Sequence, residues 1–220
     1  MNTVTREGSI GTKLGRLPKA TVGIAAIVTV VSVAEAAMGR DALGADRLTV
    51  MLGLWPARLP VQSWRLITGV LVNPAFRTKT VSLSIFDHWA INMVLLVAAG
   101  RRVERRLGPS AAVVACLAGA LASGLWQWGR FPLGGPGGGT SGASFGILGA
   151  AILLGVRAGG DYRRYALGVL AVTVLVLSWM YDREGIYFHV VAMVGGFAWA
   201  CVWAVGVPRW RPSPRHPLPT

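Results

Sequence analysis

The apolar residues of this chain fall into long runs that are separated by short polar or glycine-rich stretches. A helix of about 20 apolar residues crosses the hydrocarbon core of a bilayer, and these runs approach that length. The pattern therefore predicts six membrane-spanning helices, at residues 21–38, 86–101, 110–128, 141–156, 165–180 and 188–207.

The connections between these runs are short, which predicts one all-α polytopic membrane domain over residues 20–207. Polar tails at 1–19 and 208–220 are expected to be disordered. The exception is the first loop, residues 39–84, whose apolar part is too short to span. Because Trp55 and Trp64 suit the headgroup region, this loop is expected to lie in the membrane interface.

Composition agrees with a membrane protein. The 220 residues are 53% hydrophobic and 14% charged, whereas soluble domains carry about 25% charged residues. The net charge of +13 does not indicate a nucleic-acid partner, because the basic residues cluster at the ends of the apolar runs. Both cysteines, Cys116 and Cys201, lie inside apolar runs, where buried free thiols are expected. No pattern predicts a metal or a cofactor.

The basic residues also predict the orientation. Lysine and arginine are enriched in the two tails and in the turns at 101–106 and 157–164, which together carry 14 of the 22. Since cytoplasmic segments are enriched in these residues, both termini are expected in the cytoplasm of a cell-membrane protein.

The first span ends in Val33-Ala-Glu-Ala-Ala37, which is similar to a signal-peptidase site, so a cleaved signal is an alternative interpretation. Glu35 in this stretch is expected to be a hydrated end residue rather than a buried functional carboxylate.

A glycine run passes directly into the span at 141–156, which places Ser141 in the first helical turn. The N–H groups of a first turn lack intrahelical partners. A serine there is either an N-cap or a nucleophile with donors for its oxyanion already in place. With both termini inside, His88, Ser141 and His189 all fall near the outer ends of their spans and converge on one depth. Asn92 follows His88 on the same helix face.

Small residues at four-residue spacing allow membrane helices to approach closely. Two such stripes occur, at Gly142, Gly146 and Ala150 and at Ala192, Gly196 and Ala200. If the stripes meet, Ser141 and His189 lie at the mouth of the contact. Imidazole is then a suitable base for the hydroxyl. Ser144 is a competing nucleophile, one turn deeper in the membrane.

Five short motifs stand in order along the chain: Trp64-Arg65, His88-x-x-x-Asn92, Gly100-x-x-x-Glu104-x-x-x-Gly108, Gly139-x-Ser141-Gly142 and His189-x-x-Ala192-x-x-x-Gly196. In these motifs the chain resembles the rhomboid family of intramembrane serine proteases. The resemblance covers the family's six-helix core, and Ala192 departs from it where the family has glycine.

The resemblance implies a catalytic dyad of Ser141 as nucleophile and His189 as general base. It also implies an oxyanion hole formed by His88, Asn92 and the backbone N–H of Ser141. Asp87 is not expected to be a third member. Structural roles are implied for Trp64, Arg65, Glu104, Gly139, Gly142, Gly146, Ala192 and Gly196.

The implied function is hydrolysis of a peptide bond in the transmembrane segment of a protein substrate, near the outer face of the bilayer. One alternative is a catalytically inactive rhomboid-like protein that binds membrane clients. Another is a small transporter or channel, although that would need ionisable groups along a path through the bilayer.

Overall fold

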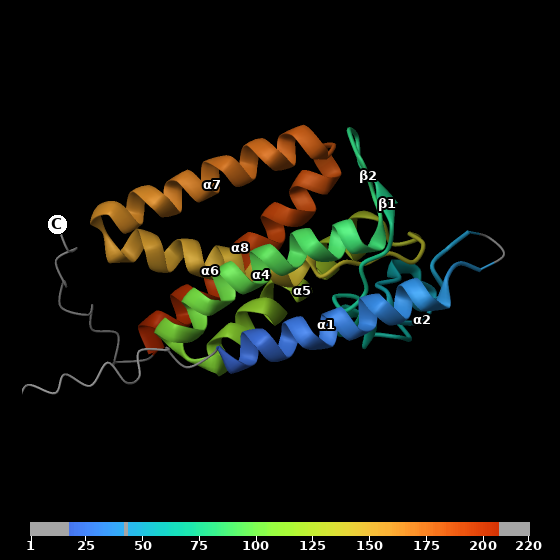
Figure 1. Cartoon of the computed structure of the whole chain (residues 1–220), viewed down its shortest axis with the longest axis horizontal. Coiled ribbons are helices and arrows are strands. Elements are labelled where there is room, and N and C mark those ends of the chain that lie inside the picture. Colours follow the sequence, from blue (N-terminus) through green and yellow to red (C-terminus); the bar gives the residue numbers. More distant parts are fainter. Residues whose placement is uncertain (1–17, 42–43, 207–220) are drawn as a thin grey trace, which may run out of the picture.

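The computed structural model describes residues 18–41 and 44–206, so the predicted tails lie outside the described residues except for Pro18 and Lys19. Figure 1 shows long helices packed side by side with a small folded region at one end. The long helices are α1 (Lys19–Met38), α4 (Ile85–Leu107), α5 (Pro109–Arg130), α6 (Ser141–Ala158), α7 (Gly160–Met180) and α8 (Arg183–Gly206).

Five of these helices, all except α4, are long and apolar enough to cross a membrane. Every stretch of 18 residues within α4 includes at least three charged side chains, which excludes it by composition. The predicted class, a polytopic helical membrane protein, is confirmed. That the chain crosses the membrane six times stays a prediction, although α4 lies along the bundle and contacts α1, α5 and α6.

Several helices extend beyond the apolar runs that predicted them. α4 continues through the charged turn to Leu107, and α8 begins at Arg183, so most of the expected loop at 181–187 is helical. Hydropathy detects only the part of a helix inside the hydrocarbon. The helical hydrogen bonds continue beyond it, until a residue such as glycine or proline ends the helix. α4 stops at Gly108, whose φ of 93° favours glycine, and Pro109 begins α5.

The first loop is folded rather than extended. It contains α2 (Arg47–Leu52), the 3-10 helix η1 (Pro56–Arg58), α3 (Arg65–Thr68) and an antiparallel hairpin of β1 (Phe76–Arg77) and β2 (Ser82–Leu83). Four of its apolar side chains, Leu48, Leu54, Leu59 and Val72, are buried, and α3 and η1 pack against α5. The hairpin was not predicted, because its paired segments are only two residues long.

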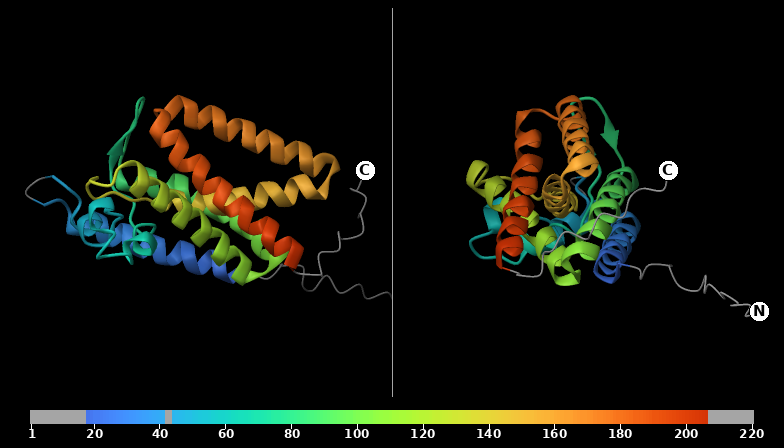
Figure 2. Two further views of the ribbon diagram at one scale, coloured as in Figure 1. Left: turned by 180° about the vertical axis from the view of Figure 1, so that it is seen from behind. Right: turned by 90° about the vertical axis from the view of Figure 1, so that its left-hand side faces the viewer.

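Helix α6 is the centre of the bundle. The right-hand view of Figure 2 shows it surrounded by other helices, and every residue from Ser141 to Gly155 is buried. The contacts are backbone to backbone. A Cβ added to Gly146 would lie 2.7 Å from the Cα of Gly119 on α5, and one added to Gly196 would lie 2.8 Å from the Cα of Gly146. The small side chains therefore hold the Ser141 helix tightly between α5 and α8.

Two carboxylates connect α1 to the rest of the fold. Glu104 of α4 accepts hydrogen bonds from the backbone N–H groups of Ala20 (3.0 Å) and Thr21 (2.8 Å) and from the Thr21 hydroxyl (2.8 Å). These bonds satisfy N–H groups at the start of α1 that have no helical partner.

Glu35, at the other end of α1, corrects the expectation of a hydrated end residue, because it is fully buried. The first loop folds over this end of α1. As a result, the Glu35 carboxylate accepts hydrogen bonds from the Thr49 hydroxyl and from the backbone N–H of Asn73.

Candidate active site

Ser141 is the first residue of α6 and is 7% exposed, at the point where the glycine-rich loop enters the bundle. The preceding residue, Thr140, already has helical dihedral angles, and its carbonyl accepts the N–H of Ser144 at 2.8 Å. The hydroxyl of Ser141 therefore stands beside the N–H groups of the first turn, which lack carbonyl partners within the helix.

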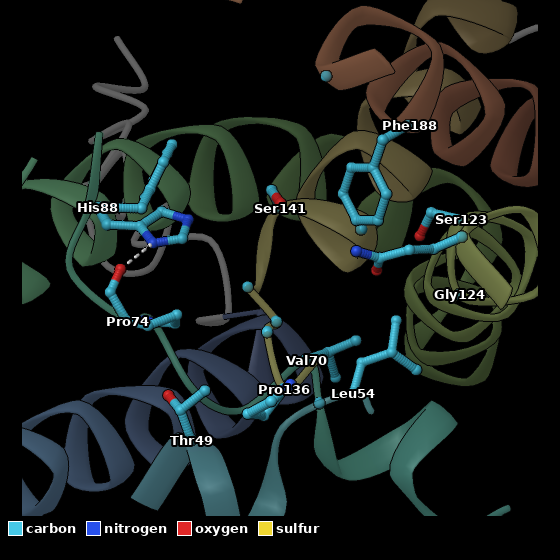
Figure 3. Close-up of a pocket in the computed structure, with 18 of the residues that line it drawn as sticks. Thr49, Leu54, Val70, Pro74, His88, Ser123, Gly124, Pro136, Ser141 and Phe188 are labelled. Atoms are coloured by element: carbon cyan, nitrogen blue, oxygen red, sulfur yellow. Dashed lines mark hydrogen bonds between the residues drawn. The ribbon is translucent and has the colours of Figure 1, made fainter. Parts of the chain in front are cut away.

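His88 lies in the first turn of α4, and Figure 3 shows its ring on one wall of the cavity that contains Ser141. Its Nδ1 is 3.0 Å from the carbonyl oxygen of Pro74. A carbonyl only accepts, so Nδ1 carries the proton, and neutral His88 has a lone pair on Nε2. A Cβ added to Gly139 would lie 3.1 Å from that Nε2 and 3.2 Å from the Ser141 Oγ. The bare α-carbon of Gly139 thus lets the imidazole and the hydroxyl approach the same point.

His189 lies on α8 and is 5% exposed. Because α8 begins at Arg183, His189 is in its second turn and not in the first, as the shorter predicted span implied. Its Nδ1 is 2.6 Å from the carbonyl oxygen of Gly185, so Nδ1 carries the proton and Nε2 is free to accept one. This tautomer is the one that a general base requires.

The His189 ring contacts three aromatic side chains. Its centroid is 4.6 Å from Phe145, 4.7 Å from Tyr181 and 5.2 Å from Phe188. Phe145 follows Ser141 by one turn on the same face of α6, so His189 lies against the face that carries the serine. Within residues 18–41 and 44–206, the structure has no hydrogen bond between Ser141 and His189.

Two cavities meet at these residues. The first, of about 590 Å³, is lined by His88, Ser141 and His189 together with residues of the first loop, α5 and the start of α8. The second, of about 430 Å³, is lined mostly by apolar side chains of α4 and α7 and reaches the same three residues. The three candidate residues therefore lie where a cavity of mixed polar and apolar lining joins an apolar opening between two helices.

Asn92 lies one turn below His88, is 1% exposed and lines only the second cavity. Its Nδ2 donates to the Oδ1 of Asn73 at 2.9 Å. The Asn92 amide carries two N–H donors, so one remains for a ligand.

A model of the rhomboid domain matches residues 60–207, which is more than half of the chain and includes His88, Asn92, Ser141 and His189. The chain belongs to the rhomboid family. A search of curated proteins found no match to it. These four residues of this rhomboid therefore lie within the domain that defines the family, a family made up largely of intramembrane serine proteases.

Two neighbouring polar residues of this rhomboid are engaged elsewhere. Ser144, the competing nucleophile, is fully buried and donates its hydroxyl to the carbonyl oxygen of Asn92 at 3.1 Å. Asp87 forms a capping box with Ser84 at the start of α4. Its carboxylate accepts from the Ser84 backbone N–H at 3.0 Å, so it faces away from the site.

Arg65 begins α3 within the first loop and is 3% exposed. Its guanidinium donates to the carbonyl oxygens of Val50 (3.2 Å) and Gly53 (2.7 Å), and it lies 4.7 Å from the ring centroid of Trp64, which is half-exposed. Desolvation by burial lowers the pKa of Arg65, but guanidinium stays protonated at neutral pH. The contacts of both residues are therefore within the first loop, and Arg65 also lines the first cavity.

The remaining predicted residues line helix contacts. A Cβ on Gly142 would lie 2.7 Å from the Ser123 hydroxyl of α5, and Ala192 is fully buried. Cys116 and Cys201 are free thiols. In the described part of the chain, no group of three or more His, Cys, Asp or Glu side chains could hold a metal ion.

Sequence reasoning missed the aromatic cover of the site. Phe76 of β1 contacts the His88 ring edge to face at 4.7 Å and stacks on Tyr181 at 6.1 Å. The hairpin also reaches the end of α7, since the N–H of Lys79 donates to the carbonyl oxygen of Met180 at 3.0 Å. No periodic pattern predicted this, because the contact joins residues about a hundred positions apart.

Proposed function

We propose that this rhomboid is an intramembrane serine endopeptidase in which Ser141 is the nucleophile and His189 the general base. The observation that carries the proposal is the meeting of Ser141, at the N-terminus of the most buried helix, with two Nδ1-protonated histidines at the junction of two cavities. Metal or cofactor chemistry is not part of the proposal.

In the proposed reaction the Ser141 Oγ attacks the scissile carbonyl carbon while His189 Nε2 takes the hydroxyl proton. The negative charge on the carbonyl oxygen is stabilised by the Ser141 backbone N–H and the free N–H of the Asn92 amide. His88 can donate from Nε2 only as imidazolium, because Nδ1 is committed to Pro74. The C–N bond then breaks as His189 protonates the amine, and water hydrolyses the acyl-enzyme by the same steps.

Transmembrane segments of membrane proteins are the proposed substrates. The apolar opening between α4 and α7 suits entry from the bilayer, and the polar groups in the lining of the first cavity suit access for water. A helical substrate must unwind there, since its carbonyls are otherwise engaged in helical hydrogen bonds.

We also propose that both termini are cytoplasmic and that the site faces the outer leaflet. The distribution of lysine and arginine supports this orientation, and the start of α1 and the end of α8 lie at the same end of the bundle, opposite the start of α6 (Figures 1 and 2), whose first residue is Ser141. Reporter fusions to each terminus test it. Activity of a periplasm-dependent or lumen-dependent reporter at either terminus contradicts it.

Labelling by a fluorophosphonate, which phosphonylates activated serines, tests the enzyme proposal. We expect labelling of the wild-type protein in detergent, none of Ser141→Ala, and retained labelling of Ser144→Ala, the matched control one turn away. His189→Ala should abolish cleavage of a model transmembrane substrate with the fold intact. Absence of labelling in the folded wild type, or equal labelling of Ser141→Ala, refutes the proposal.

A second candidate is an inactive rhomboid that binds membrane clients. The absence of a Ser141–His189 hydrogen bond within the described residues favours it, although such bonds are often long without substrate. A wild-type protein that binds transmembrane segments but is neither labelled nor able to cleave them would be this second kind.

A further inference from the structure

A cluster of buried polar side chains lies between the end of α1, the first loop and the start of α6, outside the proposed dyad. Each member is at most 5% exposed. The members are Ser32, Glu35, Thr49, Asn73, Asn92 and Thr140. Polar groups buried at this depth are costly unless hydrogen-bonded, so the bonding pattern of the cluster shows what each side chain is held by.

Asn73 is the centre of this cluster, and its amide is fully bonded. The Nδ2 group donates to the hydroxyls of Ser32 (3.1 Å) and Thr140 (3.0 Å). The Oδ1 atom accepts from the Asn92 Nδ2 (2.9 Å) and from the backbone N–H of Thr140 (3.4 Å). Because a backbone N–H can only donate, Oδ1 must face Thr140, which fixes the orientation of the amide.

The Asn73 backbone is held as firmly as its side chain. Its N–H donates to the carboxylate of Glu35 at 2.8 Å, and that carboxylate is also bonded by the Thr49 hydroxyl. Glu35 comes from α1 and Thr49 from α2, so two separate elements fix the position of Asn73.

The two residues that Asn73 contacts on the other side belong to the proposed chemistry. Asn92 is the proposed oxyanion donor, and Thr140 directly precedes Ser141. One N–H of the Asn92 amide is bonded to Asn73, and this bond sets the direction of the second N–H. Thr140 is hydrogen-bonded to two loop residues, since its hydroxyl accepts from Asn73 and also donates to the carbonyl oxygen of Val70 at 2.7 Å. The bonds thus fix the Asn92 donor relative to the backbone that carries the serine.

We propose that Asn73 is a positioning residue that aims the Asn92 amide at the oxyanion formed at Ser141, with Glu35 as its anchor on α1. This proposal rests on the proposed protease function. It assigns a reaction-supporting role to a first-loop residue that does not line either cavity.

The test compares Asn73→Ala with the wild type in kcat and KM for a model transmembrane substrate, with each value normalised to the folded fraction. Deletion of an oxyanion donor costs about 10²–10³-fold, so loss of its support is expected to lower kcat by about 10-fold with KM unchanged. Full kcat in folded Asn73→Ala overturns the proposal.

A double-mutant cycle separates positioning from a merely structural role. If Asn73 acts through Asn92, replacing Asn73 in an Asn92→Ala background should change kcat much less than it does in the wild type. Independent, multiplicative losses overturn the proposal.

Two further variants complete the design. Asn73→Asp keeps an oxygen acceptor for Asn92 and is expected to retain kcat within a few fold. If Asn73→Ala does not fold, this variant carries the test, and a loss of 10-fold or more in folded Asn73→Asp overturns the proposal. Thr29→Val is the matched control. It removes a bond of 3.1 Å between α1 and the Trp89 indole N–H of α4, so it should lower stability without lowering kcat.

Failure of this proposal and failure of the protease proposal give different results. If Asn73 has no positioning role, the wild type is still labelled at Ser141 and cleaves its substrate. If the protein is not a protease, the wild type is not labelled at all, whatever residue occupies position 73.

Discussion

The substitution Gly196→Ala tests the contact that brings the two proposed catalytic helices together. A Cβ at this position would lie 2.8 Å from the Cα of Gly146 and closer still to its carbonyl oxygen, whereas ordinary contact begins at 3.4 Å. Helices α6 and α8 must therefore separate by at least about 0.6 Å. Backbone cannot move aside as a side chain does, so we expect destabilisation of about 1–3 kcal/mol and a melting temperature lower by roughly 2–10 °C.

The same separation should reduce activity, because it opens between the helix of Ser141 and the helix of His189. A misplacement of about 1 Å can cost about 10²-fold in rate, so we expect fluorophosphonate labelling to slow by about 10- to 100-fold. Gly168→Ala is the matched control. It lies within α7, and apart from the backbone of that helix no atom lies within 4 Å of the added carbon, so alanine there should be neutral or stabilising by up to about 1 kcal/mol.

Thermal unfolding in detergent and the labelling rate at fixed temperature give both quantities for each variant. If Gly196→Ala matches Gly168→Ala in melting temperature and labelling rate, the backbones of α6 and α8 are not in close contact at Gly146 and Gly196.

Three further predictions concern the supports of the site. Glu104→Gln weakens three charge-assisted hydrogen bonds at the start of α1 and should lower stability by about 1–2 kcal/mol in thermal unfolding. Glu184→Gln, the control, loses one ion pair near the surface and should lower stability by less than about 1 kcal/mol. Equal losses of stability in the two variants would contradict the prediction. Arg65→Lys cannot reproduce the guanidinium hydrogen bonds to two loop carbonyls and should lower the free energy of unfolding by about 2–3 kcal/mol. Arg58→Lys, the control, loses only a stacking contact with Trp55 and should lower it by about 1 kcal/mol or less. A larger loss in Arg58→Lys than in Arg65→Lys, measured by chemical denaturation, would refute the supporting role of Arg65. Phe76→Ala removes the ring that covers His88. The fluorophosphonate labelling rate should rise by a few fold, which corresponds to a fall on the order of 1 kcal/mol in the activation barrier. An unchanged or slower rate would show that the ring does not cover the site.

The sequence alone determined the features that depend on local composition. The apolar runs predicted the long helices, because burial in a bilayer requires an apolar segment of fixed length. The glycine run before an apolar segment placed Ser141 at a helix start, and the small residues around Gly146 and Gly196 predicted close helix contacts. Each of these signals lies within one helix and needs no knowledge of its neighbours.

Tertiary structure decided the features that depend on which residues meet. Glu35 is buried and not hydrated because Asn73, 38 residues away, folds over it. Phe76 covers His88 because a short hairpin reaches across to the end of α7. A polar or aromatic side chain in a loop has many partners of equal chemistry available to it, and only the packing of the helices selects one. Spacing along the chain therefore identified the residues of the proposed dyad, whereas the network behind them became visible only when the first loop was seen folded against the bundle.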